Sequence, residues 1–108
     1  MSKRTRDVAR RRRRALKRIS SCHSRMREWQ ILAGRTSVED HRLVRLAYAV
    51  AECRLARVWY SVAASPTAEK RSAGNGEVWR DSRAQRQFFF SDALARLDAG
   101  EAVWLPDL

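Results

Sequence analysis

The chain has 108 residues, of which 44% are hydrophobic, and a formal net charge of +11, so it holds at most one small domain with room for a modest core. No apolar run approaches the ~18 residues that a membrane span requires, which excludes an integral membrane protein. The two cysteines lack CxxC spacing and are typical of a reduced, intracellular protein.

The net positive charge is confined to the N-terminal part of the chain. Residues 1–27 contain twelve Lys or Arg against one acid, Asp7, whereas residues 28–108 contain eleven residues of each sign. Twenty of the 23 cations are arginine, whose planar fork matches phosphate and can stack on bases. A neutral body with a concentrated basic arm predicts an element dedicated to binding a polyanion.

The first predicted helix covers about residues 8–33 and carries an apolar seam. Positions spaced 4-3-4-3 along it are apolar apart from one arginine, and they lie on one helix face. Gly34 follows directly, where a helix-ending residue in the left-handed conformation is expected. The seam reads Val8, Arg12, Ala15, Ile19, Cys22, Met26, Trp29 and Ala33.

A second helix is predicted over about residues 38–64. Two overlapping pairs of residues have capping-box spacing at its start, and Ser65–Pro66 should end it. Its seam keeps the spacing of the first. The capping pairs are Thr36 with Glu39 and Ser37 with Asp40, and the seam reads His41, Val44, Tyr48, Ala51, Leu55, Val58 and Val62.

The two seams predict an antiparallel helical hairpin. If the chain folds back around Gly34–Arg35, opposing residues have numbers that sum to about 70, and both seams fall into register. The predicted pairs are Trp29 with His41, Met26 with Val44, Cys22 with Tyr48, Ile19 with Ala51, and Ala15 with Leu55.

This register leaves a conflict at the open end of the hairpin, where Arg12 would face Val58. The five arginines of Arg10–Arg14, at 100° per residue, sweep the whole helix circumference, and cations in the first turns oppose the helix dipole. Residues 1–14 are therefore predicted to form a basic arm that is disordered until it binds an anionic partner. Residues 15–108 are predicted to form a single small helical domain.

Residues 67–76 are predicted to be a polar, flexible loop, followed by one or two further helices over about 77–99 that end at Gly100. The Phe88–Phe90 triplet cannot lie on a single helix face. Either this segment is covered on two sides, or it breaks at Ser91. The second helix is apolar on more than its seam and needs cover from this segment or from another copy of the chain, which leaves a homo-oligomer open. The apolar face expected in the third segment consists of Trp79, Phe90, Ala93 and Leu97.

The candidate binding residues are the cations of the arm and of the helix that continues it. These side chains would neutralise phosphates in an RNA groove or along DNA. A weaker basic strip lies in the third segment and would extend the site if the fold brought it beside the arm; a solvated helix face is the alternative. The full set is Lys3, Arg4, Arg6, Arg10, Arg11, Arg12, Arg13, Arg14, Lys17, Arg18, Arg25, Arg27, Arg80 and Arg83.

Residues 5–18 read TRDVARRRRRALKR. This stretch resembles the arginine-rich motif of the lambdoid phage N antiterminators, which bind a hairpin RNA and modify RNA polymerase. The resemblance implies an RNA-binding helix and, as a further partner, a protein machine that acts on nucleic acid. Those proteins carry a stacking aromatic soon after the basic run, whereas Trp29 of this chain lies far along the seam.

The sequence thus predicts an all-α, nucleic-acid-binding protein, with RNA favoured over DNA. The expected roles are a regulator of a phage or mobile element, or an accessory subunit of a ribonucleoprotein. Two alternatives stay open: non-specific DNA binding, and a protein-interaction module, an inhibitor or adaptor, whose arm docks on an acidic partner.

Neither catalysis nor a bound metal or cofactor is expected. The chain has no nucleophile elbow, phosphate-cradling glycine loop or paired-carboxylate motif, and its cysteines and histidines lack metal-ligand spacing. A polar stretch, Ser20–Ser24, follows the basic segment, so a secretory signal is not expected. A cytoplasmic location in a bacterial or phage-infected cell is predicted, with a nuclear or organellar one left open.

Overall fold

The computed structural model describes residues 2–65 and 82–106. Within that part the chain is all-α, as predicted: α1 spans Lys3–Gly34, α2 spans Glu39–Ala64 and α4 spans Ser82–Asp98. The predicted loop at 67–76, together with Trp79 and Arg80, lies outside the described residues.

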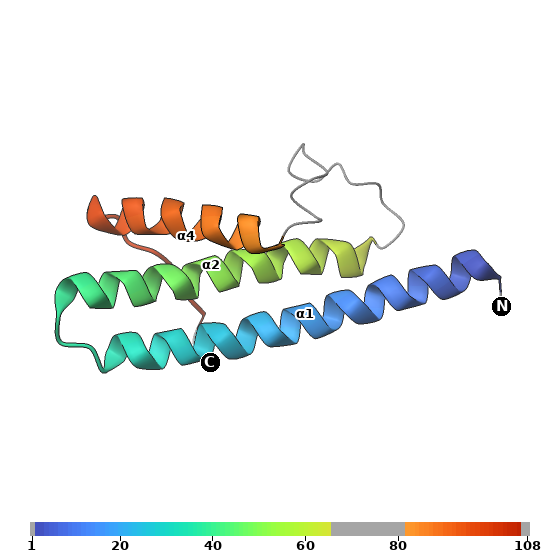
Figure 1. The fold of residues 1–108 in the computed structure, drawn as a ribbon, viewed down its shortest axis with the longest axis horizontal. Helices are drawn as coiled ribbons and strands as arrows, with labels where there is room; N and C mark the ends of the chain where they lie inside the picture. The colour runs from blue at the N-terminus through green and yellow to red at the C-terminus, as the bar shows by residue number, and fades with distance from the viewer. Residues whose placement is uncertain (1, 66–81, 107–108) are drawn as a thin grey trace.

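Helices α1 and α2 form the predicted antiparallel hairpin and lie side by side along most of α2 (Figure 1). The seam of α1 is its buried face, with Ala15, Ile19 and Cys22 all in the core. On α2, Ala51 and Leu55 are buried in the same way. The 4-3 spacing therefore identified correctly the buried face of α1. On α2 it identified the middle of the seam, whereas His41 is exposed and other residues, such as Ala47 and Val50, are buried on the side of α4.

The register of the hairpin differs from the prediction by one heptad. Trp29 stacks on Tyr48 with ring centres 4.6 Å apart, and Cys22 packs with Leu55. The numbers of these pairs sum to 77 rather than about 70. Four residues, 35–38, join the helices instead of a fold-back at Gly34–Arg35, which moves the turn toward α2. The next arrangement that again sets seam against seam lies seven residues away.

The turn is also built differently from the prediction. Gly34 is the last residue of α1 and does not adopt the left-handed conformation, and Arg35 follows with φ −98° and ψ 0°. Neither predicted capping box forms, because the N-cap of α2 is Val38 and no side chain bonds there. The hydroxyl of Thr36 instead donates to the carbonyl of Leu32 at 2.6 Å, and so satisfies an end of α1 rather than the start of α2.

Helix α4 packs on α2 and is continuous through Ser91, so the predicted break does not occur. Phe90, Ala93 and Leu97 face the core as predicted, whereas Phe88 is exposed. Gly100, with φ +82°, ends the helix as expected. The N–H of Gly100 donates to the carbonyl of Leu97 at 3.0 Å, and the N–H of Glu101 donates to the carbonyl of Arg96 at 3.0 Å. These two bonds form the Schellman pattern.

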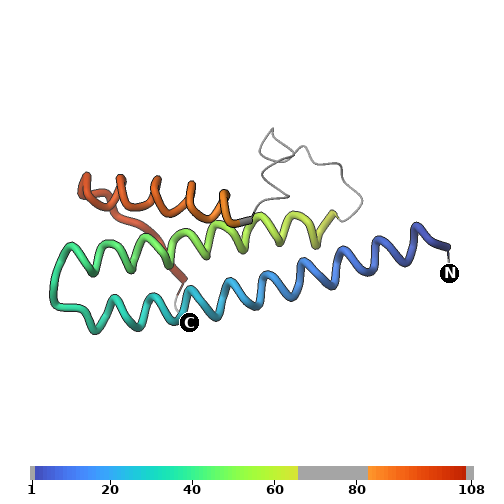
Figure 2. Tube along the Cα trace, in the orientation of Figure 1, coloured from blue at the N-terminus to red at the C-terminus, as the bar shows by residue number. Residues whose placement is uncertain are grey.

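After Gly100 the chain crosses α2 and returns to α1 (Figure 2). Val103 and Leu105 pack on the cluster formed by α2 and α4. The side-chain amide of Gln30 then donates to the carbonyl of Pro106 at 3.2 Å. The cover that the apolar second helix requires thus comes from α4 and this C-terminal tail. In the described part of the chain, no helix combines the length and the apolar character needed to cross a membrane.

Candidate nucleic-acid interface

The basic arm is the first part of α1. The hydroxyl of Ser2 accepts a hydrogen bond from the N–H of Thr5 at 3.2 Å and caps the helix. The helix therefore starts at Lys3, five residues before its predicted start. From there to Arg14 all side chains are exposed except half-buried Val8.

The arm extends past the C-terminal end of α2 (Figure 1). Arg12, the single polar residue of the α1 seam, marks where the overlap ends, because its Nε donates to the carbonyl of Ala63 at 3.3 Å. The predicted clash with Val58 is therefore absent. The shifted register brings Arg12 to the last turn of α2, where a cation meets unpaired carbonyls and the negative end of a helix dipole.

At 100° per residue, the cations before Arg12 lie on one half of the helix surface, opposite Thr5, Val8 and Ala9, and Arg12 points to the other half. The segment before Arg12 is roughly 15 Å long at ~1.5 Å per residue. No carboxylate of the described residues lies within ion-pair distance of Arg10, Arg13 or Arg14. The first turn of α1 contains no acidic residue. The arm is thus a narrow rod with a net positive charge, a form that favours phosphate ligands.

The remaining predicted site residues are divided between the surface and the core. Lys17, Arg18 and Arg27 are exposed on α1 below the arm, and the guanidinium of Arg18 lies 5.8 Å from the centre of the Trp59 ring. Arg83 is exposed at the start of α4. Arg83 is thus carried by α4, which packs on α2, and not by the helix that forms the arm.

Arg25 points into the body of the protein. Its Nε lies 3.1 Å from Oε1 of Glu52, and the Nε of Arg86 donates to the same oxygen at 2.7 Å. Glu52 is only 2% exposed, and its buried carboxylate joins α1, α2 and α4 through two arginines that are themselves partly exposed. Burying a carboxylate is tolerable only when cations compensate it. Arg25 therefore has a structural partner that sequence spacing did not indicate.

Cys22 has the environment of a packed, inert thiol. It is buried in the seam, and burial, reinforced by the charge of Glu52, raises its pKa to about 11. A thiol of this kind stays protonated at neutral pH, and only the thiolate is a metal ligand or nucleophile. Among the described residues, no group of three or more His, Cys, Asp or Glu side chains could hold a metal ion.

Trp29, the tryptophan of α1, packs against the other helices through a column of rings. Trp29 stacks on Tyr48, and Tyr48 stacks in turn on Phe90 with ring centres 4.1 Å apart. This column of rings runs through all three helices. Trp29 is thus a packing residue, and stacking of bases on it would require the column to open.

The amide hydrogens of the arm are expected to exchange within seconds at low salt without ligand, whereas those of Ile19–Met26 stay protected. The reason is that solvent reaches all sides of the projecting turns and like charges repel along them. Hydrogen exchange followed by mass spectrometry measures this difference. Equal protection before and after Ala15 would show that the arm is as stable as the body.

No protein-family model matches the chain, and no curated protein or solved structure shows significant similarity to it.

Proposed function

We propose that the protein binds structured RNA through its basic arm. The observation that carries the proposal is that the arm projects beyond α2 and that all its cations are exposed. A helix of ~10–12 Å diameter placed in a nucleic-acid groove has phosphates on two sides. Arginines that point in opposite directions can then reach both walls, which a basic patch on one face of a body cannot do.

Two further features support RNA. The cations are almost all arginine, which binds phosphate bidentately and stacks on unpaired bases. Protein contacts to RNA concentrate at loops and bulges, and arginine-rich segments often fold as they bind. The resemblance of residues 5–18 to the phage N motif points the same way. On this proposal the neutral body anchors the arm, and the biological role is that of a phage or mobile-element regulator or a ribonucleoprotein subunit.

Binding of the wild-type protein to an RNA hairpin is expected to weaken steeply with salt. Each phosphate contact contributes about 0.7–0.9 to the slope of log K against log salt, so five or more contacts give a slope of roughly −4 or steeper. Fluorescence anisotropy between about 50 and 200 mM salt measures it.

Duplex DNA of the same sequence is the comparison in that experiment, because the major groove of B-DNA also admits a helix. Tighter binding to the hairpin supports the proposal. Equal affinity for the duplex would indicate a non-specific DNA-binding protein. If the protein binds neither nucleic acid, the result would favour an acidic protein as the partner of the arm.

A further inference from the structure

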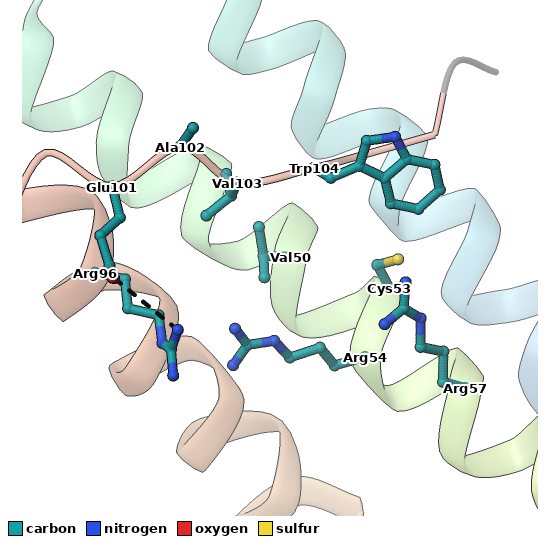
Figure 3. A pocket seen from close by; sticks show the side chains of 9 residues that line it. All are labelled: Val50, Cys53, Arg54, Arg57, Arg96, Glu101, Ala102, Val103 and Trp104. Carbon is teal, nitrogen blue, oxygen red and sulfur yellow. Dashed lines mark ion pairs between the residues drawn. The ribbon is translucent and has the colours of Figure 1, made fainter.

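A second cationic site lies away from the arm. A pocket of about 260 Å³ opens between α2, α4 and the C-terminal tail (Figure 3). Arg54 and Arg57 line it from α2, Arg96 lines it from α4, and Trp104 lines it from the tail. None of these residues belongs to the basic arm.

The guanidinium groups in this pocket are only partly compensated. Arg54 donates to Oδ2 of Asp92 at 2.6 Å, and the Nε of Arg96 donates to the same oxygen at 3.0 Å. One carboxylate, whose pKa the hydrogen bond from Arg54 holds below its usual value, thus serves two cations. Glu101 adds a contact with Arg96 at 4.0 Å.

Arg57 has no such partner. No carboxylate of the described residues lies within ion-pair distance of it. Its guanidinium lies 6.0 Å from the centre of the Trp104 ring. The pocket therefore keeps a net positive charge, with its least compensated cation beside an aromatic ring.

The tail holds Trp104 at the surface. Its neighbours Val103 and Leu105 pack on the core cluster, and side chains alternate along an extended chain. Trp104 consequently points outward and is 69% exposed. An exposed indole anchored on both sides is a ready stacking surface, since every nucleobase has an aromatic face.

We propose that this pocket binds a nucleoside phosphate, with the phosphate among Arg54, Arg57 and Arg96 and the base stacked on Trp104. The volume is below the ~300 Å³ at which pockets for drug-sized ligands begin, so it holds the phosphate while the base lies against the exposed indole. The ligand is a free nucleotide or one unit of a single strand. The site is independent of the arm and of the function proposed for it.

The test uses the full chain with Arg10, Arg13 and Arg14 replaced by glutamine (the arm variant), so that ligand bound by the arm contributes less. The four tryptophans give four indole N–H signals in a ¹H–¹⁵N spectrum, and Trp104→Phe assigns one of them. Titration with AMP should shift the Trp104 signal to saturation. Adenosine and inorganic phosphate should each bind at least tenfold more weakly, because each supplies half of the contacts.

Arg57→Gln should weaken AMP binding at least tenfold, whereas Arg42→Gln, which removes a partly exposed arginine paired with Glu39, should leave it unchanged. A short oligoadenylate that binds more tightly than AMP would identify a strand as the source of the ligand, and equal affinity would identify a free nucleotide. A Trp104 signal that AMP does not move, or an Arg57→Gln affinity equal to that of the parent, would overturn the proposal. Neither result bears on the binding of an RNA hairpin by the arm of the wild-type protein.

Discussion

The arm variant is expected to bind an RNA hairpin about a hundredfold or more weakly than the wild type at low salt. It loses three exposed guanidinium groups, and each charge-assisted contact is worth roughly 1.5–3 kcal/mol. The slope of log K against log salt should become shallower by about 2 to 3. Arg12 stays in place because it bonds to the carbonyl of Ala63, so the junction between arm and body is preserved.

A second variant of equal charge controls for the loss of positive charge as such. Arg35, Arg42 and Arg45 lie near the closed end of the hairpin, and their replacement by glutamine also removes three positive charges. This variant should keep most of its hairpin affinity, because electrostatic attraction decays within a Debye length of ~10 Å. Both variants should keep the helical content of the wild type by circular dichroism. An arm variant that binds as tightly as the control would refute the proposed role of the arm.

Met26→Asp is expected to unfold much of the body. Met26 is 1% exposed and lies opposite Ala51 in the observed register, so the new carboxylate would have no water and no partner. An uncompensated buried charge costs about 3–5 kcal/mol, against a total stability of about 5–15 kcal/mol for a typical domain. For a domain of this size the melting temperature should fall by roughly 15–30 °C, as thermal circular dichroism would show.

Leu16→Asp is the matched control on the same helix. Leu16 is 52% exposed and is surrounded by cations in sequence, so the same change in charge should alter the free energy of unfolding by no more than about 0.5 kcal/mol. If the two variants melt at similar temperatures, position 26 is not part of a buried seam and the hairpin packing is wrong.

The sequence by itself determined the helical class, the buried face of α1 and the separation of a basic arm from a neutral body. These features are local. The side-chain period of 3.6 places Ile19, Cys22 and Met26 on one face whatever lies opposite, and charge counts need no fold at all. The end of α4 at Gly100 is local for the same reason, since a left-handed residue suits glycine wherever the helix leads.

The register of the hairpin was decided only by the tertiary structure. Two seams that both repeat every seven residues fit equally well after a shift of seven. Periodicity therefore could not distinguish a register in which the numbers of opposing residues sum to 70 from one in which they sum to 77. The observed register goes with a four-residue turn, in which Thr36 bonds to Leu32 of α1 instead of capping α2. The shift also gave Arg12 a carbonyl partner and left the turns before it uncovered.

The pairing of charges was likewise beyond the reach of the sequence. Glu52 sits in the middle of an apolar helix, and nothing near it in the chain identifies Arg25 and Arg86 as its partners. The pocket joins α2 and α4 to a tail residue, Trp104, roughly fifty positions from Arg54 and Arg57. Contacts of this kind depend on which elements meet and in what register, and the energies that select them are long-range packing and desolvation terms rather than local preferences.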